Sequence, residues 1–181
     1  MHIQTHILSG WCLGNLFNLT PKERFFCIIA ASAADVDGFG FFISQELYWQ
    51  YHHLIAHNIF FISITSLLLT FFSKNKFKAF LIFFGLMHIH LIMDYFGSGE
   101  EWGITYFWPL SNWSIFNENA WPFFGWQNKA IAMAFVFWAT AIIFIQKRTF
   151  LEWLMPSLDK QIVQIAEKIK NRFAPSTVKT Q

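Results

Sequence analysis

The seven histidines of this chain all lie in its first 90 residues, and several stand near aspartates at spacings that suit metal binding. His90 and Asp94 are four residues apart, so on a helix their side chains lie on one face, about one turn apart. An imidazole and a carboxylate placed in this way can bind one metal ion or two adjacent ions. A hydrogen-bonded His–Asp pair would have the same spacing, so this motif alone leaves both interpretations open.

A second group of histidines lies in residues 51–58, where His52, His53 and His57 fall within six positions. Three imidazoles so close together are difficult to explain as ordinary packing. His2 and His6 repeat the four-residue spacing near the start of the chain. We expect His6, the one further from the terminus, to join the same site.

Two carboxylates, Asp35 and Asp37, interrupt an apolar stretch that is rich in small residues. On a regular helix they would point to different sides. Gly38 and Gly40 indicate that the helix ends or distorts here, which would let both carboxylates turn inward.

The composition is typical of a membrane protein. The chain of 181 residues is 55% hydrophobic and 20% aromatic, and only 13% of its residues are charged, about half the share in an average globular chain. This excludes a disordered chain, and no basic face outside the tail is available for nucleic acid. Cys12 and Cys27 lie in apolar stretches and are too few for a disulfide scaffold, so we expect both to be buried.

Five apolar stretches predict membrane-embedded helices, at residues 3–19, 25–44, 59–73, 77–93 and 130–146. Residues 150–173 predict an amphipathic helix that is interrupted near Pro156, and residues 174–181 a frayed tail. We therefore expect an all-α, polytopic membrane helix bundle of about five helices plus a C-terminal amphipathic helix. Residues 1–146 would form the membrane-embedded metal-site domain, and residues 147–181 a basic cytoplasmic helix and tail.

Small residues indicate where two of these helices approach each other. Gly10 and Gly14 form a small-xxx-small spacing, and residues 30–34 contain only alanine and serine. Between the fourth and fifth spans, residues 97–129 form a long connection rich in tryptophan and glycine. This connection could anchor the chain at the membrane interface or take part in binding substrate.

Pairs of predicted spans separate three clusters of basic residues, which are Lys22 and Arg24, then Lys74, Lys76 and Lys78, then Lys147 and Arg148. The positive-inside rule places these clusters in the cytoplasm and residues 97–129 outside. In this orientation the histidine and aspartate groups all fall at one depth, near the non-cytoplasmic face.

At that depth the sequence predicts a metal site built from His6, Asp35, Asp37, His52, His53, His57, His90 and Asp94. Mixed nitrogen and oxygen donors suit zinc or manganese, and there are enough donors for two divalent ions. The absence of cysteine ligands and the excess of donors favour a catalytic site over a closed structural one. Asp35 or Asp37 would then act as the general base.

The order of these motifs resembles that of the YdjM-type predicted membrane-bound metal-dependent hydrolases, over about residues 1–115. The motifs are His6, Asp35-x-Asp37, His52-His53-x-x-x-His57-Asn58 and His90-x-x-x-Asp94, followed by Gly97 and Gly103…Pro109. That family usually has His-Arg-x-x-Thr-His-Ser at residues 52–58, so the resemblance places His53 where the family has an arginine. His53 could therefore bind metal or only fill the electrostatic role of that arginine, and either His52 or His53 could be the ligand. More distantly, the all-helical order of histidines and aspartates resembles that of zinc-dependent phospholipase C.

The resemblance implies a multi-pass protein of a bacterial-type inner membrane with hydrolase activity. Together with the predicted metal site, it leads us to expect metal-activated water to hydrolyse a phosphoester in a membrane lipid or lipid-linked substrate. The alternative is a non-enzymatic membrane protein that binds metal, or a structural one whose histidines and aspartates only pair with each other.

Overall fold

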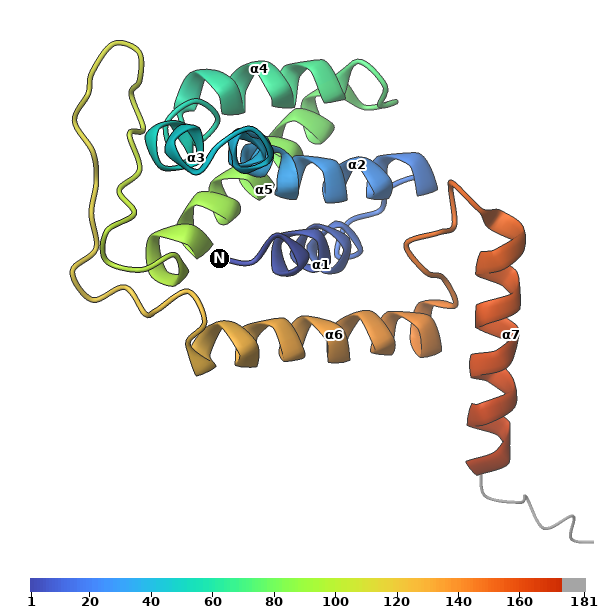
Figure 1. The fold of residues 1–181 in the computed structure, drawn as a ribbon. Helices are drawn as coiled ribbons and strands as arrows, with labels where there is room; N and C mark the ends of the chain where they lie inside the picture. The colour runs from blue at the N-terminus through green and yellow to red at the C-terminus, as the bar shows by residue number, and fades with distance from the viewer. Residues whose placement is uncertain (174–181) are drawn as a thin grey trace, which may run out of the picture.

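The structure, a computed structural model, describes residues 1–173, which form seven α-helices and one 3-10 helix and contain no strand (Figure 1). The prediction of an all-α fold is confirmed, and the predicted tail at residues 174–181 lies outside the described part of the chain. The elements are α1 (Ile3–Gly14), α2 (Pro21–Ser32), the 3-10 helix η1 (Ala33–Phe42), α3 (Gln45–Tyr51), α4 (Ile59–Thr70), α5 (Lys76–Gly97), α6 (Trp126–Gln146) and α7 (Pro156–Phe173).

Three segments are long and apolar enough to cross a membrane, judged by length and composition, and these are Pro21–Phe42, Lys76–Gly97 and Trp126–Gln146. The first combines α2 with η1. The other two predicted membrane helices, α1 and α4, have 12 residues each. At about 1.5 Å per residue they are roughly 18 Å long, well short of the ~30 Å hydrocarbon core of a bilayer.

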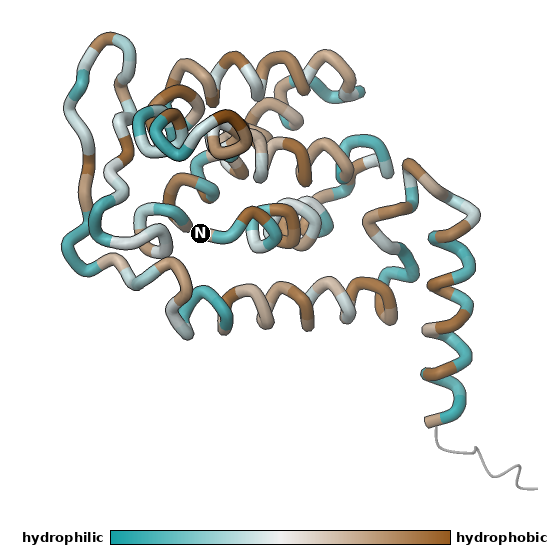
Figure 2. Tube along the Cα trace, viewed as in Figure 1, coloured by the Kyte–Doolittle hydropathy of each residue, from teal (hydrophilic) through white to brown (hydrophobic). Residues whose placement is uncertain are grey.

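The helices pack as a row in which α6 contacts α1, α1 contacts α2, α2 contacts α5 and α5 contacts α4 (Figure 1). Helix α7 packs against α6 but runs across its direction (Figure 1). Figure 2 shows hydrophilic and hydrophobic residues alternating along α7, as the amphipathic prediction requires. The helix begins at Pro156, because proline is tolerated in the first turn and disrupts a helix interior.

Close contact between α1 and α2 confirms the interpretation of the small residues. A Cβ atom added at Gly10 would lie 2.5 Å from the carbonyl oxygen of Cys27 and 2.7 Å from the Cβ of Ala31. Gly14 is equally restricted, with the Cβ of Cys27 only 2.8 Å from such an atom. Because His6 lies one turn before Gly10, this contact brings its imidazole close to the end of α2.

The three basic clusters lie at the same end of the bundle. The Arg24 guanidinium donates two hydrogen bonds to the Glu152 carboxylate, at 2.5 and 2.9 Å, and so connects the start of α2 to the segment after α6. Glu23 accepts a hydrogen bond of 3.1 Å from the backbone nitrogen of Lys74, which ties the turn after α4 to the same place. The chain start, η1 and α3 lie at the opposite end (Figure 1).

Candidate metal centre

The fold brings all eight predicted ligand residues to the end of the bundle opposite the basic clusters. Helix α1 contributes His6, η1 contributes two aspartates, the turn between α3 and α4 contributes three histidines, and α5 contributes His90 and Asp94. Their donor atoms form three overlapping groups that could each hold an ion, namely His6, Asp35, His90 and Asp94, then His53, His57 and Asp94, then Asp37, His52 and His57.

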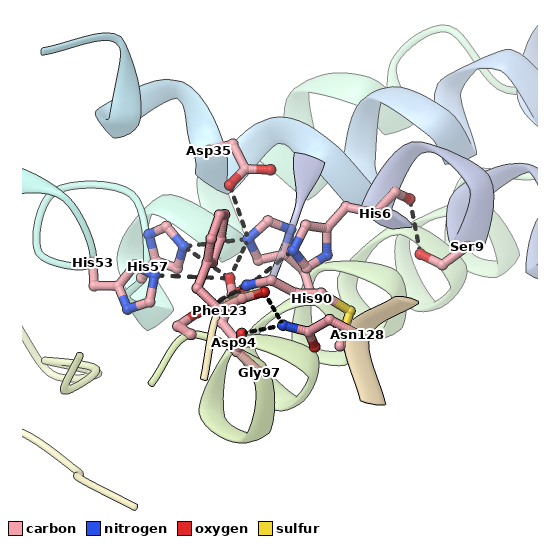
Figure 3. A network of polar contacts seen from close by, with 12 residues as sticks. His6, Ser9, Asp35, His53, His57, His90, Asp94, Gly97, Phe123 and Asn128 are labelled. Carbon is pink, nitrogen blue, oxygen red and sulfur yellow. Dashed lines mark hydrogen bonds and ion pairs between the residues drawn. The ribbon is translucent and has the colours of Figure 1, made fainter. Parts of the chain in front are cut away.

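We call Asp94 with His6, His57 and His90 the Asp94 centre, whose side chains point toward one another in Figure 3. All four side chains are almost completely buried. The Asp94 Oδ2 atom lies 2.9 Å from His90 Nε2 and 3.3 Å from His57 Nε2. These two nitrogens are 3.2 Å apart. The other oxygen, Oδ1, lies 3.2 Å from His6 Nε2 and also contacts the amino group of Met1.

Hydrogen bonds on the outer side of two imidazoles determine which nitrogen faces this centre with a lone pair. His90 Nδ1 lies 2.6 Å from the carbonyl oxygen of Ala31, which can only accept, so Nδ1 carries the hydrogen. His57 Nδ1 lies 2.9 Å from the Asp37 carboxylate and donates in the same way. In a neutral histidine the opposite nitrogen then has a lone pair, so both Nε2 atoms are available to bind a metal at the Asp94 centre.

The donor atoms of the Asp94 centre fit a divalent metal ion in both chemistry and spacing. Zinc forms bonds of ~2.0–2.1 Å to nitrogen and oxygen in tetrahedral geometry, which places ligand atoms about 3.3–3.4 Å apart. The three distances among Asp94 Oδ2, His57 Nε2 and His90 Nε2 are 2.9, 3.2 and 3.3 Å. Buried polar atoms without a hydrogen-bond partner among the described residues lie in the same region, namely His6 Nδ1, Asp35 Oδ2, His53 Nδ1 and Asp94 Oδ2.

The second carboxylate of this region, Asp37, is satisfied by hydrogen bonds. Its Oδ1 accepts from His52 Nδ1 at 2.7 Å, and its Oδ2 accepts from His57 Nδ1 at 2.9 Å and from the backbone nitrogen of Ala56 at 3.1 Å. We call these residues the Asp37 node. A carboxylate that holds the outer nitrogen of a metal-binding histidine fixes the tautomer and the ring orientation.

The 3-10 conformation of η1 explains how Asp35 and Asp37 can both face inward. In an α-helix, residues two apart point about 160° away from each other, whereas in a 3-10 helix the difference is about 120°. Asp37 therefore reaches the histidine turn, while Asp35 Oδ1 approaches His90 Nε2 at 3.9 Å. The sequence prediction of a distorted helix near Gly38 and Gly40 agrees with this arrangement.

His53 has an unusual backbone, with a φ of +66° that places it in the left-handed region. Only a few per cent of residues other than glycine adopt this region, and such strain often marks functional sites. The conformation directs the imidazole into the protein, where the side chain is 3% exposed and Nε2 lies 4.0 Å from Asp94 Oδ2. His52, the neighbouring residue, instead binds Asp37.

The two buried histidines of the turn have opposite protonation tendencies. Burial, together with the charge of His57, lowers the pKa of His53 well below its ordinary value, which leaves its imidazole neutral and able to bind metal. Burial alone would also lower the pKa of His57, but the Asp37 carboxylate outweighs it and raises the pKa to about 10. Without a metal, a proton on His57 Nε2 therefore supplies positive charge beside Asp94, and metal binding would release that proton.

Two aromatic residues that the sequence analysis did not select cover the histidine turn. Tyr48 of α3 stacks on His52, with ring centroids 4.7 Å apart. The ring centroid of Trp102, in the long connection, lies 5.1 Å from that of His52 and 5.2 Å from that of His53. The Trp-rich composition of residues 97–129 was the only sequence signal for this contact. The connection also fixes the turn, because the carbonyl oxygen of Tyr106 accepts from Ile59 N at 2.9 Å.

His88 faces away from the site, as two steps along a helix from His90 predict. Its Nδ1 lies 2.8 Å from the carbonyl oxygen of Phe84, and its Nε2 lies 2.8 Å from the Tyr106 hydroxyl. Asn128, which is fully buried, was not predicted from the sequence as part of this region. Asn128 donates to the carbonyl oxygen of Gly97 at 2.7 Å and so joins the start of α6 to the end of α5 below the site (Figure 3).

The family described as YdjM inner membrane protein matches residues 1–158, which is most of the chain. No curated protein and no solved structure matches the chain significantly.

Proposed function

The chain belongs to the YdjM family of inner membrane proteins, and from this premise we propose that it is a membrane-bound metal-dependent hydrolase. Its substrate would be a phosphoester in a membrane lipid or a lipid-linked compound. One observation carries the proposal: the Nε2 atoms of His57 and His90 converge within 3.3 Å of a buried Asp94 oxygen that has no hydrogen-bond partner in the described part of the chain. The buried Asp94 carboxylate needs positive charge nearby, and a divalent cation bound at this oxygen would supply it in place of the His57 proton.

The overlap of the donor groups supports a site for two ions, zinc or manganese. One ion would be held by His6, His90 and Asp94, beside Asp35, and the other by His53, His57 and Asp94. Asp94 belongs to both groups and would help to hold both ions. His53 stands where the resemblance places an arginine, and its imidazole would serve as a ligand where arginine would serve as a fixed charge.

The two ions would supply a water of lowered pKa and positive charge beside the negative charge that develops on the phosphoester. Asp35 would accept the proton of that water at Oδ2, which has no hydrogen-bond partner among the described residues. This assigns the role of general base to Asp35, because both oxygens of Asp37 already accept hydrogen bonds. Asp37 would orient His52 and His57.

The orientation that we propose places the site at the non-cytoplasmic face and the basic clusters in the cytoplasm. Cysteine labelling can test it, because the native Cys12 and Cys27 are both fully buried. In intact cells an impermeant maleimide should label Leu110→Cys, a position that is 80% exposed in the long connection. It should not label Phe77→Cys, which is 74% exposed beside the Lys74–Lys78 cluster. The reverse result would move the site to the cytoplasmic face.

Activity should be measured on detergent-purified protein loaded with zinc or manganese, using a panel of phospholipids and lipid phosphates and assaying the released phosphate or headgroup. Asp35→Asn should retain metal through His6, His90 and Asp94 but lower turnover by about 10²–10⁴-fold, as expected for loss of a general base. His88→Ala, on the same helix as two ligands but away from the site, is the control. Metal binding without turnover of any substrate in the panel would support the non-enzymatic alternative instead.

A further inference from the structure

A cavity of about 410 Å³ lies beside the metal centre, on the side formed by η1. Asp35 and His52 contribute polar side chains to the lining, and most of the remaining lining is apolar and includes Ile3, Phe39, Phe42 and Phe123. Its volume is within the range of about 300–1,000 Å³ that is usual for small-molecule sites. The cavity is therefore mostly apolar, with polar residues of the candidate metal site at its edge.

We propose that this cavity binds the hydrocarbon chain next to the phosphate of an amphiphilic phosphoester, which enters from the bilayer and not from water. The inference rests on the proposed hydrolase function and specifies its substrate class. The two ends of the substrate would then bind at different places. The metal centre would bind the phosphate, and the cavity would bind the adjoining methylene groups.

The entrance of the cavity supports access from the bilayer. Phe39, Phe41 and Phe42 are 56%, 57% and 81% exposed, and they form the last part of the candidate membrane span Pro21–Phe42. Such a cluster of exposed aromatic side chains is unfavourable in water but suits contact with lipid. A hydrocarbon chain can pass from the membrane into the cavity along these rings without exposure to water.

The polar lining residues support a phosphate at the part of the cavity next to the Asp94 centre. The side chains of Asp35 and His52 are both 12% exposed, and Asp35 Oδ1 lies 3.9 Å from His90 Nε2 of the Asp94 centre. An anionic headgroup in this position would be repelled by Asp35 and Asp94 unless divalent cations were bound. Binding of the headgroup should therefore depend on metal, whereas the gain from the hydrocarbon chain should depend on the cavity.

Gly38 offers a way to fill the cavity without removing a ligand. A Cβ atom added there would lie 3.4 Å from His52 Cε1 and 3.8 Å from Tyr48 Cε2, two residues of the cavity wall. Gly38→Leu should therefore occupy space that the hydrocarbon chain needs. Gly85→Leu is the matched control, because its Cβ would meet no atom within 4 Å and it lines a different, apolar cavity of about 340 Å³.

The test uses ethyl-, butyl- and octylphosphonate, which cannot be hydrolysed, with zinc-loaded protein and calorimetric measurement of affinity. In the wild type and in Gly85→Leu, affinity should rise with chain length, by up to about fourfold for each added methylene that is buried. Gly38→Leu should bind ethylphosphonate as the wild type does but lose the gain for octylphosphonate. All three proteins should bind the same amount of zinc.

A second variant keeps the test valid if Gly38→Leu does not fold. Phe42→Asp, at a position that is 81% exposed, places a charge at the entrance and should weaken octylphosphonate binding but not ethylphosphonate binding. Zinc-dependent binding that is independent of chain length in the wild type would overturn the cavity assignment and leave the metal centre intact. Loss of the chain-length gain in Gly85→Leu alone would also overturn it. A wild-type protein that binds no zinc would refute the hydrolase proposal and this inference with it.

Discussion

Asp94 and Asp37 are both buried carboxylates that contact the same imidazole, yet their surroundings differ. Asp37 binds the Nδ1 side of His57 and accepts three hydrogen bonds in total, from two histidines and a backbone nitrogen. Asp94 faces the Nε2 side of His57, and its Oδ2 atom accepts none. Burial and residue type are alike in the two carboxylates, so they do not distinguish the proposed metal ligand, Asp94, from the proposed orienting residue, Asp37. Their hydrogen bonds differ: N–H donors satisfy both oxygens of Asp37, whereas the Oδ2 atom of Asp94 is left without a donor among the described residues.

The difference also has an energetic consequence. The Asp94 Oδ2 atom has no hydrogen-bond partner within residues 1–173, and a buried carboxylate is strongly destabilising unless positive charge compensates it. In the metal-free protein that charge comes from the Met1 amino group, which contacts Oδ1, and from a proton on His57, whose pKa is raised to about 10. The Asp37 node needs no such compensation, because N–H donors already satisfy it. Variants that affect the two carboxylates should therefore differ in their effect on metal binding.

The largest effect is expected for Asp94→Asn. Asparagine keeps the shape but loses the anionic charge that two proposed ions would share, so the affinity for both ions should fall by more than about 100-fold, beyond the range for an orienting residue. Metal content after desalting should approach zero, and far-UV circular dichroism should be unchanged. Retention of both ions would show that Asp94 is not a ligand.

An intermediate effect is expected for His53→Gly, which removes one imidazole and should lower the metal content from two ions to one. Glycine adopts a φ of +66° without the penalty of about 1–2 kcal/mol that a Cβ atom carries there, so the metal-free protein should remain about as stable. His53→Ala is the control, since it should lose the same ion but melt at a lower temperature. If both variants keep two ions, His53 does not bind metal.

A smaller effect is expected for Asp37→Asn. The ligand atoms of the Asp94 centre remain, but His57 loses the partner that fixes its tautomer, so metal affinity should fall by about 10–100-fold. At saturating metal the stoichiometry should still match the wild type, which equilibrium titration with a competing chelator can measure. A complete loss of one ion would instead make Asp37 a direct ligand and remove the distinction between the two carboxylates.

Much of the fold could be predicted from the sequence, because its main signals are local. The five apolar stretches correspond to α1, α2 with η1, α4, α5 and α6, although α6 begins at Trp126 and not near residue 130. Helix α2 begins earlier than predicted, at Pro21, because Thr20 and Glu23 form a capping box. Helix α3 has only seven residues and no clear hydrophobic period, so nothing in the sequence indicated it.

The residues that gather at the site could also be selected from their types and spacing, but their different environments could not. The tautomer of His90 depends on the carbonyl oxygen of Ala31, which is 59 residues away in the chain. The donors to Asp37 come from a turn that follows α3, and the backbone of His53 takes a rare conformation within that turn. These features arise from tertiary contacts, which hydrophobic pattern and residue spacing do not encode.

The most direct test of the account compares His90→Ala with His88→Ala by counting bound metal. The two histidines lie on one helix, but His90 faces the Asp94 centre and His88 binds Tyr106. Purified proteins would be loaded with zinc or manganese, desalted and analysed by mass spectrometry of the metal. We predict two ions per chain for the wild type and for His88→Ala, and loss of at least one ion for His90→Ala. Equal metal content in the two variants, or no metal in the wild type, would contradict the proposed metal centre.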